Sequence, residues 1–218
     1  MNRSEVVKSL CSSGVVGIVR VESGEALINI AEALLKGGLD SIEITMSCPG
    51  AVRAIEKARA KLNDAIIGAG TVLDAQTARL CILSGAQFIV TPTVEPEVIE
   101  VSHRYGVPVI PGGTTITEIL RCWEMGADMV KVFPAKILGP EYLKAIHAPL
   151  PYIPFMPTGG ISVLNAGEFV RAGASVIGVG GELVDKQAVR DDHFSVLTER
   201  ASKLSAAVKA AREGMSTE

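Results

Sequence analysis

The stretch EMGADMVKVFP (124–134) contains the pattern that decides the fold of this chain. A glycine ends a helix-like segment, a small and an acidic residue follow it, and a short apolar run then ends at a proline. Glycine is common at this position because it adopts the left-handed conformation that ends many helices. A short valine-rich run bounded in this way is typical of a buried parallel strand. The same glycine signal precedes other apolar runs, in KGGLDS, LSGAQF, RYGVPV and RAGASV.

Strand-like runs of this kind recur along the whole chain. They are VVGIVRV (15–21), SIEIT (41–45), AIIGAGT (65–71), FIVTP (88–92), VPVIPG (107–112), MVKVFP (129–134), IPFMPT (153–158) and SVIGVG (175–180). Amphipathic helices are expected between them over 24–36, 50–62, 74–84, 95–105, 115–125, 139–147 and 163–172, with a last helix at about 194–212. Eight βα units without a linker predict an α/β protein: one (β/α)8 TIM barrel domain over residues 1–218, preceded by an extra N-terminal helix in MNRSEVVKSL.

An open, doubly wound sheet is the competing architecture. The segment IGAGTVL (67–73) matches the first two glycines of the dinucleotide-binding fingerprint, but Leu73 stands where the third glycine should be. The next strand, FIVTP, does not end in the acidic residue that would bind a ribose. The count of eight units therefore favours the barrel.

The composition limits the kinds of partner that this chain can bind. Apolar residues make up 48% of the 218 residues, which is enough for one sizeable core. The net charge of −3 and the lack of a basic patch argue against binding to nucleic acid or to an anionic membrane surface. No apolar run approaches the ~18 residues of a membrane span. The cysteines and histidines lie far apart, so we expect reduced cysteines, no metal, no cofactor and a cytoplasmic location.

Lys131 interrupts the apolar run at 129–134. Strand alternation places Met129, Lys131 and Phe133 on one face of this strand, and neither face of a barrel strand meets bulk water. Burial favours the neutral amine, which is the form that adds to carbonyl groups. The alternative is a packed stem whose ammonium group reaches the barrel mouth. Position alone leaves these two interpretations equal.

Glu43 interrupts the strand SIEIT in the same way. The two strands concerned are both even-numbered, and alternate strands of a barrel contribute side chains to the same interior layers. The carboxylate and the amine are therefore expected to share one cavity. A structural ion pair is the alternative, but desolvation offsets much of the attraction within a buried pair. We therefore favour a reactive amine at Lys131 paired with Glu43 as a catalytic acid/base.

Two glycine clusters, PTGGIS (157–162) and GVGGEL (178–183), follow the seventh and eighth strands. Barrels often bind phosphate in these two loops through backbone N–H groups. Tight turns alone are the simpler alternative, but two clusters in both loops favour phosphate. Lys136, in the loop after the sixth strand, is either an additional cation or an ordinary solvated lysine.

Several motifs in order resemble one known family. GIVR (17–20), EIT (43–45), GAGTV (68–72), KVFPA (131–135) and PTGGIS resemble the 2-keto-3-deoxy-6-phosphogluconate (KDPG) aldolases and their relatives, which act on the galactonate epimer and on 4-hydroxy-2-oxoglutarate. The resemblance covers about residues 6–212. It implies a metal-free class I aldolase on a (β/α)8 barrel, usually a homotrimer, in the Entner–Doudoroff pathway.

The resemblance also assigns roles to residues. It implies that Lys131 forms the Schiff base and that Glu43 is the acid/base. It implies that Thr71 helps to hold the pyruvate carboxylate, and that Thr158, Gly159 and Gly160 bind at the phosphate end. Arg20 and the backbones of Gly159, Gly160, Gly180 and Gly181 are candidate groups for the anions at either end of the substrate.

Two positions depart from the family pattern. Ser47 stands where some gluconate-type members carry an arginine, and Gly181 stands where many members carry a serine. The first departure, together with Arg20, is more similar to the galactonate-type enzymes. The expected reaction is cleavage of KDPG or its galactonate epimer to pyruvate and glyceraldehyde 3-phosphate. The alternatives are cleavage of 4-hydroxy-2-oxoglutarate to pyruvate and glyoxylate and, more distantly, a non-catalytic barrel that binds sugar phosphates.

Overall fold

The computed structural model describes residues 1–20 and 26–215. Val21, which ends the first predicted strand, and positions 24–25, which begin the first predicted helix, lie outside these ranges. The elements, in chain order, are α1 (Arg3–Ser13), β1 (Val15–Val19), α2 (Ala26–Lys36), β2 (Ser41–Thr45), α3 (Ala51–Lys61), β3 (Ile66–Gly70), α4 (Ala75–Leu83), β4 (Ile89–Val90), α5 (Pro96–Arg104), β5 (Val109–Ile110), β6 (Gly112–Gly113), α6 (Ile116–Glu124), β7 (Val130–Val132), α7 (Ala135–His147), β8 (Phe155–Pro157), α8 (Ala166–Arg171), β9 (Ile177–Val179), α9 (Lys186–Arg190) and α10 (Phe194–Met215).

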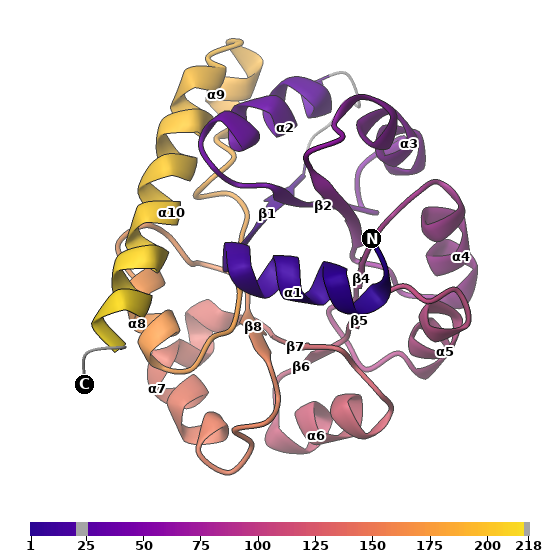
Figure 1. Cartoon of the computed structure of the whole chain (residues 1–218), viewed down its shortest axis with the longest axis vertical. Helices are drawn as coiled ribbons and strands as arrows, with labels where there is room; N and C mark the ends of the chain where they lie inside the picture. Colours follow the sequence, from indigo (N-terminus) through magenta and orange to yellow (C-terminus); the bar gives the residue numbers. More distant parts are fainter. Residues whose placement is uncertain (21–25, 216–218) are drawn as a thin grey trace.

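The strands pair in parallel and curl, with the helices outside them (Figure 1). Within residues 1–20 and 26–215, one sheet has the order β5-β4-β3-β2-β1-β9 and a second has the order β6-β7-β8. Only Pro111 separates β5 from β6, and a proline lacks the N–H group that would continue the ladder. Isolated bridges pair Phe155 with Ala174 and Thr158 with Gly178, so β8 also lies beside the chain of β9.

The glycines that were predicted to end helices do so in the left-handed conformation. The φ angles are +84° at Gly38, +97° at Gly85, +66° at Gly106, +92° at Gly126 and +105° at Gly173. Each of these glycines lies between a helix and the strand that follows it. A residue with a β-carbon would be strained at these angles, so this part of the prediction is confirmed.

The structure departs from the predicted elements around α7 and α9. Helix α7 begins at Ala135, four residues before the predicted start, and is kinked at Gly139, where φ is +76° just before Pro140. Helix α9 was not predicted, because five residues are too few to show a helical period. Its N-terminus is capped by the side chain of Asp185, which accepts hydrogen bonds from the backbone N–H groups of the first turn.

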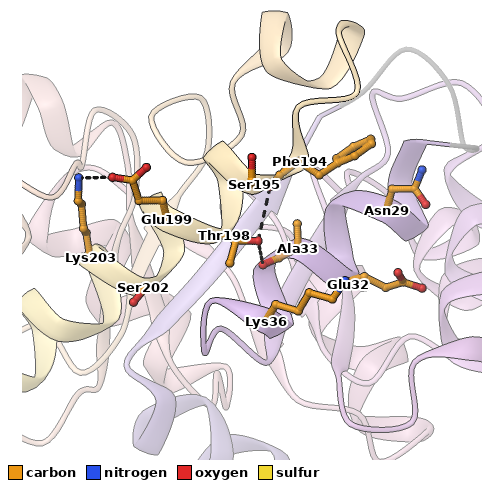
Figure 2. Close-up of a pocket in the computed structure, with 10 residues that line it drawn as sticks. All are labelled: Asn29, Glu32, Ala33, Lys36, Phe194, Ser195, Thr198, Glu199, Ser202 and Lys203. Atoms are coloured by element: carbon orange, nitrogen blue, oxygen red, sulfur yellow. Dashed lines mark hydrogen bonds and ion pairs between the residues drawn. The ribbon is translucent and has the colours of Figure 1, made fainter.

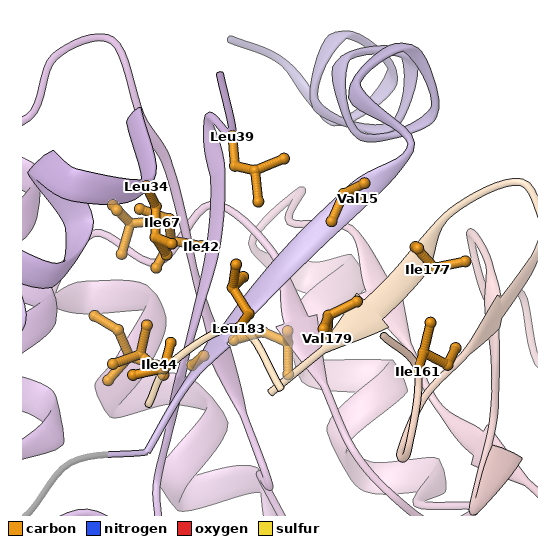
Figure 3. Close-up of a cluster of buried hydrophobic side chains, with 14 of the residues drawn as sticks. Val15, Leu34, Leu39, Ile42, Ile44, Ile67, Ile161, Ile177, Val179 and Leu183 are labelled. Atoms are coloured by element: carbon orange, nitrogen blue, oxygen red, sulfur yellow. The ribbon is translucent and has the colours of Figure 1, made fainter. Parts of the chain in front are cut away.

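Side chains on the two faces of the sheet enter different apolar clusters. Ile42 and Ile44 of β2, and Val130 and Val132 of β7, pack with the surrounding helices in the larger cluster, part of which Figure 3 shows. The second cluster lies on the concave side of the sheet and includes Met129. The alternation predicted for β2 and β7 is therefore confirmed, and Glu43 and Lys131 share the concave side.

Helix α1 covers one end of the curled sheet. In Figure 1 it lies across the middle of the ring of helices. Its side chains Val6 and Leu10 are buried in the concave cluster together with Phe88, Met129 and Met156. This end of the fold is therefore apolar and filled, and the polar residues that follow along the strands lie at the opposite end. None of the helices in the described ranges has the length and apolar composition that a membrane span requires.

Candidate active site

A cavity of about 460 Å³ opens at the C-terminal ends of the strands. Every site residue predicted from the sequence lines it: Arg20, Glu43, Thr71, Lys131, Thr158, Gly159, Gly160, Gly180 and Gly181. These residues come from six different strands or the loops that follow them. The fold therefore brings together groups that are separated by up to 161 residues in the sequence, from Arg20 to Gly181.

Glu43 is the most buried polar group in this cavity. Its side chain is fully buried, and neither carboxylate oxygen has a hydrogen-bond partner among the described residues. Burial raises the pKa of this carboxyl group, while the positive charges of Lys131 and Arg20 oppose that rise. The net effect is a raised pKa, so Glu43 holds its proton to a higher pH than a solvated carboxyl group does.

Lys131 lies at the centre of β7 with only 5% of its surface exposed. Its backbone N–H donates to the carbonyl of Pro111 at 2.8 Å, which fixes the strand in register with its neighbour. The ammonium nitrogen lies 5.3 Å from the centroid of the Phe133 ring, within range of a cation–π contact. No hydrogen bond joins Lys131 to Glu43, since both oxygens of that carboxylate are unpaired within the described chain. The amine and the acid therefore face one cavity without being tied to each other.

Thr71 follows β3 directly and has a φ angle of +57°. This left-handed conformation is strained for a β-branched residue and turns the chain sharply at the rim of the cavity. Thr71 also lines an adjacent surface groove together with Ser47. Ser47 itself does not line the main cavity, and its hydroxyl donates to Oγ1 of Thr45 at 3.2 Å. Ser47, where the sequence departs from the family pattern, therefore lies in the neighbouring groove, and Thr71 lines both the groove and the cavity.

The loop after β8 is shaped by glycine and by one asparagine. The φ angles are +99° at Gly159 and +71° at Gly160, so both positions favour glycine. Asn165 donates through Nδ2 to the carbonyl of Gly160 at 3.1 Å, and its Oδ1 accepts from the N–H of Ser162 at 2.8 Å. These two bonds hold the loop in a compact turn beside Thr158, which is 4% exposed.

Seven further lining residues were not among the predicted site residues: Ile18, Pro92, Phe133, Ile161, Glu182, Val184 and Lys186. Alternation placed Phe133 on the same face as Lys131, so a signal for it was present. Glu182 and Lys186 lie in the turn before α9 and at the start of α9, where no periodic pattern marks the chain. Lys136, the cation considered from sequence, is exposed and is not among the lining residues.

A larger groove of about 720 Å³ lies elsewhere, on the outer surface between α2 and α10 (Figure 2). It shares no residue with the cavity at the strand ends. An ion pair of 2.6 Å between Glu199 and Lys203, and a hydrogen bond from Thr198 to the carbonyl of Ala33, lie along it. Because α/β folds place their chemistry at strand ends, the smaller cavity is the better candidate. Among residues 1–20 and 26–215, no His, Cys, Asp and Glu side chains group together as a metal site would require.

Comparisons with known proteins show the family of the chain. A family model described as KDPG and KHG aldolase matches residues 6–199. The chain belongs to this family. It is 38% identical over 186 residues to the 2-dehydro-3-deoxy-phosphogluconate aldolase of Treponema pallidum, covering 84% of this chain and 88% of the relative. It is 36% identical over 171 residues to the 2-dehydro-3-deoxy-6-phosphogalactonate aldolase of Escherichia coli K12, covering 77% and 83%.

A solved structure from the KDPG and KHG aldolase family extends the likeness to three dimensions. The KDPG aldolase of Legionella pneumophila, captured with pyruvate as a covalent carbinolamine intermediate, superposes with a TM-score of 0.85. It is 30% identical to this chain, and the match covers 91% of this chain and 97% of that one. The fold prediction is therefore confirmed at the level of an α/β protein with a curled parallel sheet.

Proposed function

We propose that this protein is a class I aldolase that cleaves KDPG or its galactonate epimer to pyruvate and glyceraldehyde 3-phosphate. One observation supports this most directly: Lys131 is 5% exposed and shares a cavity with the fully buried Glu43, whose carboxyl pKa is raised. Curated relatives carry the names of both the gluconate and the galactonate activity. The relative from Legionella pneumophila forms a covalent carbinolamine with pyruvate, which is the chemistry proposed for Lys131.

The reaction begins with attack of the Lys131 amine on the C2 ketone. The carbinolamine loses water to give an iminium, and removal of the C4 hydroxyl proton then breaks the C3–C4 bond. The bonding electrons move into the iminium, which becomes an enamine, and glyceraldehyde 3-phosphate leaves. Protonation of the enamine at C3 and addition of water release pyruvate and restore the free amine. The iminium is the electron sink, so this sequence has no step that needs a metal or an organic cofactor.

Glu43 is the group that moves the protons in this sequence. Its raised pKa brings the carboxyl group closer to the range in which a general acid and base works well than a solvated glutamate would be. Neither of its oxygens is committed to another described residue, so both are available to the substrate or to a bridging water. Thr71 holds the carboxylate end, and Arg20, Thr158 and the glycine backbones bind the anionic groups of the substrate.

We also infer that the strands close into one (β/α)8 TIM barrel domain over residues 1–218. The bridges from Phe155 to Ala174 and from Thr158 to Gly178 support closure at one seam, and the single residue Pro111 between β5 and β6 supports it at the other. The extra N-terminal helix then seals the end of the barrel away from the cavity. A homotrimer and a cytoplasmic location remain predictions that rest on the family resemblance.

Cleavage of 4-hydroxy-2-oxoglutarate to pyruvate and glyoxylate is the second candidate. It uses the same lysine and glutamate, and Gly181 offers no side chain to a phosphate group. A non-catalytic binding protein fits less well, because two unpaired, buried carboxylate oxygens cost stability and binding alone does not require them.

Trapping with pyruvate tests the proposal. Incubation with pyruvate followed by borohydride reduction is expected to add one pyruvate-derived group to Lys131, which peptide mass spectrometry locates. Lys131→Met is expected to abolish the adduct, whereas Lys144→Met, on the exposed side of α7, retains it. An adduct absent from the wild-type protein, or carried by another lysine, would contradict the mechanism. Turnover of the two phosphorylated epimers and of 4-hydroxy-2-oxoglutarate then identifies the substrate.

A further inference from the structure

We propose that Lys186, opposed by Glu182, determines how strongly this enzyme prefers a substrate whose far end carries a phosphoryl group. This inference rests on the proposed aldolase function and names a specificity determinant within the same cavity. Both residues line the cavity together with Gly180 and Gly181. Both are exposed, whereas Lys131 is buried.

The segment that carries these two residues has a defined shape. The carbonyl of Gly180 accepts hydrogen bonds from the N–H groups of Leu183 and Val184, each at 2.9 Å, which closes a tight turn after β9. Leu183 and Val184 are buried, whereas Glu182 and Lys186 are exposed. The buried pair anchors the turn to the core, so the two charged side chains are held at the cavity mouth.

Arg200 of α10 fixes the same segment from behind. Its guanidinium donates to the carbonyl of Glu182 at 3.1 Å and forms an ion pair of 2.9 Å with Asp185. The Asp185 carboxylate also accepts from the N–H groups of Gln187 and Ala188, each at 2.9 Å. The carboxylate next to Lys186 is therefore already engaged. No ion pair within the described chain occupies the Lys186 ammonium, which leaves it available to a ligand in the cavity.

A phosphoryl group needs a local cation in this protein. The net charge of −3 gives no long-range attraction for a dianion. Gly181 provides only its backbone, and a β-carbon at this position would meet no atom within 4 Å, so the space beside it is open to a ligand. Lys136 does not fill the role, because its stem lies against Gly160 and it does not line the cavity. Besides Lys131, the cations among the lining residues are Arg20 and Lys186, and of these two Lys186 belongs to the segment that follows Gly181.

Glu182 acts in the opposite direction. Glu182 lines the same cavity, and its negative charge disfavours a dianion there, while a neutral hydroxyl end of a substrate experiences no such penalty. The two side chains together make the site responsive to charge at the far end and leave the chemistry at Lys131 unaffected. Removing either charge should therefore change the ratio of activities, not the ability to form the Schiff base.

Kinetics on a matched pair of substrates test this. The pair is KDPG, or its galactonate epimer if that is the better substrate, and the same sugar acid without its phosphate. Lys186→Met is expected to lower kcat/KM about tenfold for the phosphorylated member only, as loss of a charge-assisted contact predicts. Glu182→Gln is expected to raise it roughly threefold, as removal of a solvent-screened repulsion predicts. Lys136→Met is the matched control and should change the ratio less than about twofold.

Ionic strength and a conservative variant provide readouts that a structural role would not change. The KM of the wild-type enzyme for the phosphorylated substrate should rise with salt, and this rise should be smaller in Lys186→Met. Lys186→Arg should restore most of the preference. An equal loss on both substrates in Lys186→Met, or a selective loss in Lys136→Met, would overturn the inference. Failure of pyruvate to form an adduct at Lys131 would instead overturn the proposed function, so the two failures are distinguishable.

Discussion

The carboxylate of Glu43 lies directly against the backbone of Gly70, on the neighbouring strand β3. A β-carbon at Gly70 would overlap the carboxyl group, so the side chain of Glu43 occupies the space that any other residue would fill. The two strands pair in parallel through this region, with Thr45 opposite Gly70. Gly70, the second glycine of GAGTV, is therefore required because Glu43 on the adjacent strand occupies the space beside it. This contact, and not the binding of a dinucleotide, accounts for the glycine at this position of the partial fingerprint.

Gly70→Ala should displace the Glu43 carboxyl group and lower kcat by at least about 100-fold, since catalytic groups tolerate little misplacement. Steady-state kinetics measures this, and borohydride trapping reports whether Lys131 still reacts. Gly214→Ala is a suitable control, because a β-carbon there meets no atom within 4 Å. Wild-type turnover in Gly70→Ala would show that Glu43 is not the proton carrier.

Glu43→Gln should lower kcat by about 10²- to 10⁴-fold, because the amide cannot exchange a proton. The same variant should change the pH dependence of stability. Burial raises the pKa of Glu43 above its ordinary value of 4.5, so the folded state retains a proton that the unfolded state releases. The contribution of this group to the free energy of unfolding is therefore fully present below about pH 4.5. It is lost as the pH rises through the folded-state pKa.

The free energy of unfolding of Glu43→Gln, relative to that of the wild-type protein, should accordingly increase as the pH rises from about 4.5 and then level off. Urea unfolding at a series of pH values measures this difference. A constant difference across the series would mean that the carboxyl group titrates normally in the folded protein.

Thr71→Gly should relieve the left-handed strain and raise the free energy of unfolding by about 1 kcal/mol. The same change removes the hydroxyl that is proposed to hold the substrate carboxylate, so KM for pyruvate in the aldol direction should rise. Thr71→Ala is the comparison, because alanine loses the hydroxyl but retains a β-carbon at a φ of +57°. If alanine stabilises the protein as much as glycine does, backbone strain is not the cause.

Gly181→Ser should fit without a clash, since no atom lies within 4 Å of the added β-carbon and the backbone there is not left-handed. A hydroxyl at this point adds a donor beside the proposed phosphate position. KM for the phosphorylated substrate should fall by about threefold to tenfold, as one additional hydrogen bond predicts. An unchanged KM, with the folded structure intact, would place the phosphate elsewhere.

The strands and the central site residues were predictable because they depend on local patterns. A charged residue between two buried ones, as at Lys131 and Glu43, costs desolvation free energy, and such a cost indicates a functional role. The glycines that end helices predicted a left-handed backbone conformation, because few other residues adopt it.

The rest of the cavity depends on contacts between distant segments. Glu182 and Lys186 reach the mouth because Arg200, on a different helix, holds their turn, and nothing near them in the sequence records that contact. The strained conformation of Thr71 was equally hidden, since threonine ordinarily avoids it. The break between β5 and β6 at Pro111 was visible as a proline, but its effect on pairing needed the neighbouring strand.

Helix α1 and the concave apolar cluster also affect how substrates enter the site and how products leave it. Met129, Met156 and Phe88 are fully buried and pack with α1, so an apolar floor closes this end of the fold. In the proposed reaction, pyruvate would be bound to Lys131 near this floor, and the phosphorylated fragment would lie nearer Gly181. The fragment would then leave first and pyruvate would follow, and the synthetic direction would begin with pyruvate. The closed floor would thus reinforce the order of release that the covalent bond to Lys131 already sets.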